Sequence, residues 1–310
     1  MNIPSPLIPA SLQARDINFL FQIVLIISAI ILLIVAGLVL YSAVRFRRRP
    51  GDPVPTQDFG NTKLEIAWTV IPLLIVTVMF FLSVRTMHAV DPPPLNRPPD
   101  VQVVAHQWWW EFSYPESGVI TANELHIPID KNLLFSVTSA DVVHDFWVPQ
   151  LARKIDAIPA RKNFAWIAAD QPGLYLGTCA EYCGVEHAWM RIRVVAQSPE
   201  EFSQWQKEQL AIPAKPTEPL AVKGYNVFMN LPCSNCHRIA GTPADKDIGP
   251  DLTHIGSRQT LAAGVFVNSP GNLEAWIADP QKFKPGCHMP DLQLEPAELT
   301  ALTAYLKELQ

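Results

Sequence analysis

Two stretches near the N-terminus lack the mixture of polar and apolar positions found in the rest of the chain. Ile17–Val44 and Ile66–Val84 contain no charged side chain and are almost entirely apolar. Each is long enough to cross a hydrocarbon core of roughly 30 Å as a helix, and the first is too long for the apolar region of a signal peptide. Pro72 in the second stretch is compatible with a membrane helix. The pattern predicts a transmembrane hairpin within residues 1–98, with these two stretches as its helices.

The loop between the two stretches carries a run of basic residues. Arg45 and Arg47–Arg49 directly follow the first predicted helix. Short arginine-rich loops stay on the cytoplasmic side of a membrane. The N-terminus and everything after about residue 85 are therefore expected outside the cytoplasm.

From residue 99 onwards the pattern changes to an alternation of apolar and polar positions. The alternation is clear at residues 101–105, and Leu133–Thr138 and Arg191–Val195 also resemble short strands. Turn residues at short intervals between such strands are typical of an antiparallel sandwich or barrel. The sequence predicts an all-β domain over residues 99–211 that ends in a helix at Pro199–Leu210.

A proline-rich linker at residues 212–219 separates this domain from a block with a third pattern, residues 220–310. Proline-rich linkers are stiff and extended. Within the block, Leu220–Met229, Asn272–Ala278 and Pro296–Leu309 show helical spacing of apolar residues. We expect a small all-α domain.

Net charge and cysteine content reduce the number of function classes that fit the chain. The net charge of −5 at pH 7 argues against binding to nucleic acid, which favours a basic surface. The five cysteines are an odd number, which does not fit a simple disulfide framework. Four of them form two closely spaced pairs, each beside a histidine, and this pattern favours metal or cofactor chemistry.

The first cysteine pair belongs to a dense cluster of metal-binding residue types. Cys179 and Cys183 are followed by His187 and Met190, and His144 lies upstream in VVHDFWVP. Thiolate, imidazole and thioether groups together select copper, and a second cysteine lets two coppers share both thiolates. A structural zinc site is an alternative, although zinc sites rarely include methionine. A disulfide between the two cysteines is another.

The second cysteine pair lies in Cys233-Ser-Asn-Cys236-His237, the C-x-x-C-H signature of covalent haem attachment. In this motif the two thiols add to the haem vinyl groups, and the histidine is placed to ligate the iron. A thioredoxin-like redox pair is the alternative, but the proline and the βαβ pattern of that family are missing.

The block around this signature resembles a class I cytochrome c, with Gly249-Pro-Asp-Leu252 and Lys284–Pro290 in the expected order. The resemblance implies that Met289 is the second axial iron ligand, and His/Met ligation suits an electron carrier. The neighbouring His288 is the rival ligand. Cys287 departs from the family pattern, and we interpret it as a free thiol packed beside the haem.

Several motifs together resemble subunit II of cytochrome c oxidases, over roughly residues 15–205. They are CAEYCGVEHAWM, VVHDFWVP, HQWWWEFSY, KIDAIPAR and, at the head of the second helix, LEIAWTVIP. The resemblance implies a cupredoxin fold and the dinuclear copper centre CuA. Its ligands would be His144, Cys179, Cys183, His187, Met190 and the backbone carbonyl of Glu181. The carboxylate of Glu181 would in addition serve a magnesium site shared with subunit I.

Two further roles follow from the resemblance. Trp108 matches the tryptophan through which the family receives electrons from cytochrome c, although a buried strand aromatic would look the same. Glu65 matches the acid at the mouth of a proton-uptake path in subunit I. A carboxylate at a helix N-terminus is also a favourable partner of the helix dipole.

The resemblance implies the electron-accepting subunit of a proton-pumping, caa-type cytochrome c oxidase. A donor, cytochrome c or another carrier, would reduce haem c, which reduces CuA, and subunit I would then reduce oxygen to water. No catalytic residue is expected in this subunit. Its expected partners are oxidase subunits I and III, and its expected place is the bacterial inner membrane with both soluble domains on the periplasmic face.

One other function remains as an alternative, and two further ones are excluded. A membrane-anchored, stand-alone copper and haem electron carrier would have the same cofactors without oxidase partners. A quinol oxidase subunit II would lack the copper ligands. Nitrous oxide reductase also carries CuA, but its large propeller domain does not fit in 310 residues.

Overall fold

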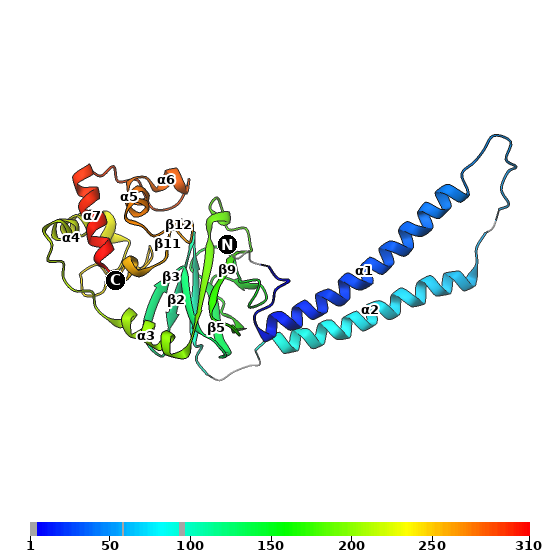
Figure 1. Ribbon diagram of the computed structural model, residues 1–310, viewed down its shortest axis with the longest axis horizontal. Coiled ribbons are helices and arrows are strands. Elements are labelled where there is room, and N and C mark those ends of the chain that lie inside the picture. The colour runs from blue at the N-terminus through cyan, green and yellow to red at the C-terminus, as the bar shows by residue number, and fades with distance from the viewer. Residues whose placement is uncertain (1–4, 58, 93–96) are drawn as a thin grey trace. The chain divides into compact units, whose positions relative to one another are not determined.

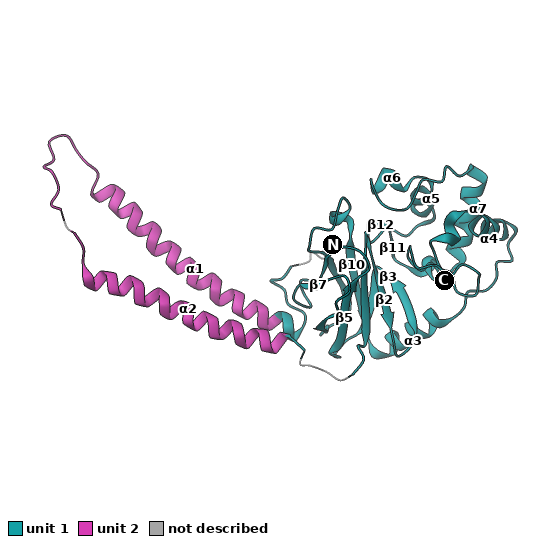
Figure 2. Ribbon diagram, turned by 180° about the vertical axis from the view of Figure 1, so that it is seen from behind, with its two compact units in different colours: residues 1–14, 91–310 teal, residues 15–90 magenta. Residues whose placement is uncertain are grey.

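The computed structural model describes residues 5–57, 59–92 and 97–310. They form two compact units, residues 15–90 and a second unit that joins residues 91–310 to the first residues of the chain (Figure 2). In this second unit the N-terminal segment adheres to the β domain, residues 99–211, because the Ala10 N–H donates to the carbonyl of Gln150 at 2.8 Å.

The first unit is a pair of long helices joined by a loop (Figure 1). Helix α1 spans Leu12–Arg45 and α2 spans Thr62–Val90. Both expose nearly all their apolar side chains and are long and apolar enough to cross a membrane, as the sequence predicted. Each helix extends beyond its apolar stretch, because hydrophobicity marks the part suited to hydrocarbon and not the end of the backbone hydrogen bonds.

The β domain consists of two five-stranded sheets, ordered β3-β2-β1-β5-β8 and β4-β10-β9-β6-β7. Pairing is antiparallel except between β1 and β5 and between β10 and β4, which run parallel. The strands are β1 Val101–His106, β2 Trp109–Tyr114, β3 Val119–Ala122, β4 Glu124–Pro128, β5 Leu133–Ser139, β6 His144–Trp147, β7 Ile155–Ala157, β8 Asn163–Ile167, β9 Gly173–Cys179 and β10 Arg191–Gln197.

Alternate residues of these strands form the core between the sheets. The burial of β1 alternates along the strand, as its sequence pattern predicted. Trp110, Phe112 and Phe135 are fully buried around Phe146, whose ring lies 5.4 Å from that of Trp110. Such aromatic packing supplies a large apolar area, and it fixes the strands that carry His144 and Cys179.

A helix closes the β domain at its C-terminal end. Helix α3, Pro199–Leu210, begins with a capping box in which the Ser198 and Glu201 side chains each accept a backbone N–H of the other residue. Its Trp205 stacks on His126 of β4, with ring centroids 4.2 Å apart. The helix thereby brings the chain to the start of the linker at a defined place.

The C-terminal domain, residues 220–310 of the sequence prediction, is mainly helical. Its helices are α4 Pro219–Asn230, α5 Pro270–Ala278, α6 Pro280–Phe283 and α7 Pro296–Glu308, and a small ladder pairs β11 Thr260–Leu261 with β12 Phe266–Val267. Helices α4 and α7 cross closely, because Gly224 lies directly against the carbonyl of Ala301, where a Cβ atom would clash. The sequence did not predict α6 or the ladder, which are too short to show a period.

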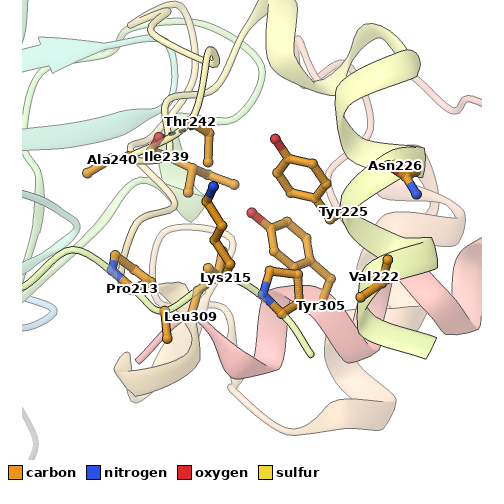
Figure 3. Close-up of a pocket in the computed structure, with 13 residues that line it drawn as sticks. Pro213, Lys215, Val222, Tyr225, Asn226, Ile239, Ala240, Thr242, Tyr305 and Leu309 are labelled. Atoms are coloured by element: carbon orange, nitrogen blue, oxygen red, sulfur yellow. Dashed lines mark hydrogen bonds between the residues drawn. The ribbon is translucent and has the colours of Figure 1, made fainter. Parts of the chain in front are cut away.

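The linker packs against the C-terminal domain. Pro213 and Lys215 line one side of a cavity of about 310 Å³, and Val222, Tyr225 and Tyr305 line the other (Figure 3). The ring centroids of the two tyrosines lie 5.6 Å apart. The sequence predicted a stiff linker, and in the structure residues 213–216 of the linker lie beside the domain that follows. The fold class is confirmed: a transmembrane helical hairpin, an all-β sandwich and a small helical domain.

Candidate copper and haem sites

The five side chains predicted to bind copper meet at one end of the β sandwich. His144 begins β6 and Cys179 ends β9, and these strands are neighbours in the same sheet. Cys183 lies in the loop after β9, His187 in the 3₁₀ turn η1, His187–Trp189, and Met190 directly before β10. The loop after β9 thus brings Cys183, His187 and Met190 back to His144 and Cys179, whose strands β6 and β9 are fixed by the core.

Sulfur and nitrogen atoms of the cluster lie within bridging distance of one another. Cys183 Sγ is 3.8 Å from Cys179 Sγ, 3.6 Å from His187 Nδ1 and 3.9 Å from Met190 Sδ. Cys179 Sγ lies 3.9 Å from His144 Nδ1. A disulfide requires sulfurs about 2.05 Å apart, so the two cysteines are free thiols in this structure.

The backbone of Glu181 faces the same cluster. Its carbonyl oxygen lies 3.2 Å from Cys179 Sγ, whereas its side chain is exposed. The five side chains and this carbonyl form a donor set of two sulfurs, two imidazoles, one thioether and one oxygen. A single tetrahedral zinc ion cannot use six donors, and soft sulfur with imidazole suits copper. The set therefore fits a pair of coppers.

Electrostatics of the cysteine pair favours a bound cation. The hydrogen bond between the two sulfurs and then that with His144 lower the pKa of Cys179 to about 3. The resulting thiolate, together with burial, raises the pKa of Cys183. A bound metal ion would allow both sulfurs to be deprotonated.

The sequence did not predict the role of Asp141. Its Oδ1 lies 2.7 Å from His144 Nε2, and its Oδ2 accepts the backbone N–H of Gln107 at 2.6 Å. Burial opposes ionisation of Asp141, but the hydrogen bonds, first that from His144, lower its pKa overall. A carboxylate behind a metal-binding histidine fixes the tautomer and orients the ring. Here it leaves Nδ1 of His144 facing the sulfurs.

The haem-attachment motif opens into an apolar cavity of the C-terminal domain. Cys233, Cys236 and His237 line this cavity together with His288 and Met289. His237 Nδ1 donates to the carbonyl of Pro250 at 2.7 Å, which leaves Nε2 free for iron. Burial lowers the pKa of His237, which favours the neutral ring. The apolar lining, the two thiols and the oriented imidazole fit a covalently attached haem.

The two rival axial ligands differ in their surroundings. The Met289 carbonyl accepts a hydrogen bond from Gln281 Nε2 at 2.9 Å, which fixes the backbone at this position. His288 is exposed, and its ring centroid lies 5.0 Å from that of Trp108. Gln281 Nε2 also approaches Cys287 Sγ at 3.3 Å. The cysteine lines the haem cavity as a half-buried free thiol.

Trp108 contacts both sites. Its indole lines the haem cavity, and its Nε1–H donates to the carbonyl of Cys183 at 2.9 Å. Gly184 has a φ of +118°, and a Cβ atom there would lie 2.8 Å from the Trp108 ring. Only glycine combines this backbone conformation with such a close approach, so the copper loop is shaped to receive the indole.

Comparison with known proteins identifies the family. The description "Cytochrome C oxidase subunit II, transmembrane domain" matches residues 8–86, "Cytochrome C oxidase subunit II, periplasmic domain" residues 118–197, and "Cytochrome c" residues 221–310. Cytochrome c oxidase subunit 2 of Alkalihalophilus pseudofirmus is 36% identical over 309 residues, covering 97% of this chain and 90% of that protein. The chain belongs to the cytochrome c oxidase subunit II family.

A second relative agrees with this assignment, and one solved structure is also similar in sequence. Cytochrome c oxidase subunit 2 of Bacillus subtilis is 35% identical over 293 residues, covering 87% of this chain and 82% of that protein. The periplasmic domain of subunit II of the Bradyrhizobium japonicum cytochrome oxidase is 31% identical, covers 36% of this chain and 95% of that chain, and gives a TM-score of 0.35.

As a cytochrome c oxidase subunit II, the chain is part of a haem–copper terminal oxidase and has a role in electron transfer. It is a two-pass inner-membrane protein that carries a cytochrome c domain of its own. The predicted family and subunit are confirmed. Glu65, for which the resemblance implied a proton-path role, lies in the first turn of α2 and belongs to the unit of residues 15–90.

Proposed function

We propose that this subunit II receives electrons at a haem c bound to Cys233 and Cys236, with His237 and Met289 as iron ligands, and passes them to CuA and on to subunit I. When bound, haem c and the copper pair supply one-electron redox chemistry. The chain itself positions the two groups, and no bond of a substrate forms or breaks in it.

The position of Trp108 carries this proposal. Its indole touches the haem cavity on one side and the backbone of the copper ligand Cys183 on the other. Replacing Trp108 by Ala should slow electron transfer from haem to copper while both groups remain bound. Flash-reduction kinetics on the purified oxidase measures this step. An unchanged rate with intact copper and haem spectra would show that Trp108 is only a core aromatic.

The CuA site of the proposal consists of His144, Cys179, Cys183, His187, Met190 and the carbonyl of Glu181. The distances given above support this set. The exposed carboxylate of Glu181 is proposed for a magnesium site at the surface facing subunit I, and Glu65 for the mouth of a proton path in that subunit. A Glu65→Gln variant should lower oxygen reduction by the complex without changing the copper and haem content of this chain.

The proposed orientation places both soluble domains on the periplasmic face, beside subunits I and III and accessible to a cytochrome c or another donor. The arginines at 45 and 47–49 support it. A reporter fused after Gln310 should be active outside the cytoplasm. The alternative, a stand-alone carrier, predicts that purification in mild detergent yields this chain without a large polytopic partner.

A further inference from the structure

The β domain completes the haem cavity of the C-terminal domain. Gln107, Trp108, Trp109 and Asn123 of the β domain line the same cavity as Cys233 and Cys236. The relative placement of the two domains therefore determines how the haem pocket is closed and how near it lies to the copper loop. Contacts that fix this placement would act on electron transfer without touching either redox group.

Glu124, the first residue of β4, makes the most specific of these contacts. Its carboxylate accepts three hydrogen bonds, from the backbone N–H of Gln259 at 3.0 Å, the N–H of Thr260 at 2.7 Å and the Thr260 hydroxyl at 2.7 Å. Gln259 and Thr260 belong to the C-terminal domain, beyond the linker. The side chain of Arg193, on the neighbouring strand β10, donates to Gln259 Oε1 at 3.3 Å.

Because Glu124 is buried, its carboxylate depends on the hydrogen bonds that the docked C-terminal domain donates. The residue is only 3% exposed, and in the described part of the chain each of its side-chain hydrogen bonds comes from the C-terminal domain. A buried carboxylate without donors is strongly unfavourable. Within the β domain alone this carboxylate would have Arg193, with Nε 4.0 Å away, and the electrostatic influence of His126. The three donors explain why an acidic residue occupies this position.

A second contact between the two domains involves Lys284, which lines the haem cavity. Lys284 of the C-terminal domain is 3% exposed, donates from Nζ to the carbonyl of Trp108 at 3.3 Å and lies 3.9 Å from Glu186 of the copper loop. The backbone N–H of Arg191 adds a hydrogen bond to the carbonyl of Ala263 at 3.2 Å. Glu124 and Lys284 thus hold the C-terminal domain against the β domain at two separate places. The contact between the rings of Trp108 and His288 belongs to the same interface.

We propose that Glu124 is a positioning residue, which seats the C-terminal domain on the β domain through the backbone of Gln259 and Thr260 and so holds the haem pocket against Trp108. The inference rests on the proposed order of electron transfer from haem c to CuA. It adds that the two domains move as one body in the working oxidase, and that the linker does not serve as a loose tether.

Hydrogen exchange on the complete oxidase directly tests the contact of Glu124 with Gln259 and Thr260. In Glu124→Gln the side-chain NH₂ faces one of the backbone donors, so amides of the peptide containing Gln259 and Thr260 should exchange about tenfold faster than in the unaltered protein. Thr260→Val, which removes one donor and keeps the shape, should have a smaller effect in the same direction. Glu116→Gln, an exposed position of the β domain, is the matched control and should change nothing.

The functional readout is the rate of electron transfer from haem to copper. In Glu124→Gln this rate should fall and become dependent on solvent viscosity, while the copper and haem spectra stay unchanged. Unchanged exchange at Gln259 and Thr260 in both variants overturns the proposal. Faster exchange with an unaltered electron-transfer rate overturns it as well. Failure of the proposed electron path would give a different result. The unaltered oxidase would then show no electron transfer from haem to copper, while hydrogen exchange at Gln259 and Thr260 would still respond to the Glu124 substitution.

Discussion

Asp141 Oδ1 lies 2.7 Å from His144 Nε2, and this contact directs the other ring nitrogen of His144 toward Cys179 Sγ, 3.9 Å away. The same carboxylate holds the backbone N–H of Gln107, the residue before Trp108. One side chain therefore fixes both a proposed copper ligand and the turn between β1 and β2 that carries the proposed electron-transfer residue.

Replacing Asp141 by Asn should weaken copper binding by about 10- to 100-fold, because the uncharged amide supports the His144 tautomer less strongly. Titration of the purified chain with a competing copper chelator measures the change. Asp130→Asn is a suitable control, since Asp130 is an exposed residue with a positive φ that Asn also adopts. Equal copper affinity in Asp141→Asn and the control would show that Asp141 does not support His144.

Elemental analysis of the purified chain should give two coppers and one covalent haem. Cys183→Ser should abolish the mixed-valence copper signal in electron paramagnetic resonance, because one bridging sulfur is lost. Met190→Leu should keep both coppers and shift their potential, since a buried thioether is replaced by an apolar group of similar size. Zinc in place of copper in the unaltered protein would contradict the copper assignment.

The axial-ligand proposal separates two adjacent residues. Met289→Ala should convert the haem to a high-spin form and lower its potential by on the order of 0.1 V, because the thioether ligand raises it. His288→Ala should leave the spin state unchanged. Optical spectra and a redox titration of the two variants decide between the residues, and the opposite pattern would assign the iron to His288.

Asp145 gives the copper-free protein a defined pH dependence. Burial, and then the neighbouring Asp156, raise its pKa to about 7 from the usual 3.8. Between these values the folded chain keeps a proton on Asp145 that the unfolded chain has released, so the contribution of Asp145 to the free energy of unfolding should fall as the pH rises from about 4 to about 7 and then level off.

The variant Asp145→Asn removes this titration. It should be more stable than the unaltered chain at pH 8 by up to about 4 kcal/mol, and no more stable at pH 4. Denaturant unfolding after copper removal, followed by circular dichroism, measures both. Parallel stability profiles for the two proteins across this range would mean that Asp145 is not responsible.

Some features could be predicted from the sequence because they depend on local pattern. Hydrophobic runs located α1 and α2, since a membrane helix is recognised residue by residue, and alternation located β1 because each strand has one buried face. The C-x-x-C-H motif and the spacing of Cys179 to Met190 indicated the two sites, because their chemistry is held within a few residues.

Other features depend on contacts that spacing does not reveal. Glu124 and Thr260 are separated by 136 positions, and Lys284 and Trp108 by 176. In the sequence each of these residues resembles an ordinary surface charge or strand residue. Asp141 lies only three positions from His144, but many aspartates precede histidines without supporting a metal ligand. Their roles became visible only in the folded chain.

The shared lining of the haem cavity has a consequence for biogenesis. Because Gln107 and Trp108 line the same cavity as Cys233 and Cys236, a docked β domain narrows the access to the two thiols. Thioether formation is therefore expected first, on a C-terminal domain that is still separate, and domain docking afterwards. In this order of maturation, haem is attached to the C-terminal domain before the β domain docks and completes the haem pocket.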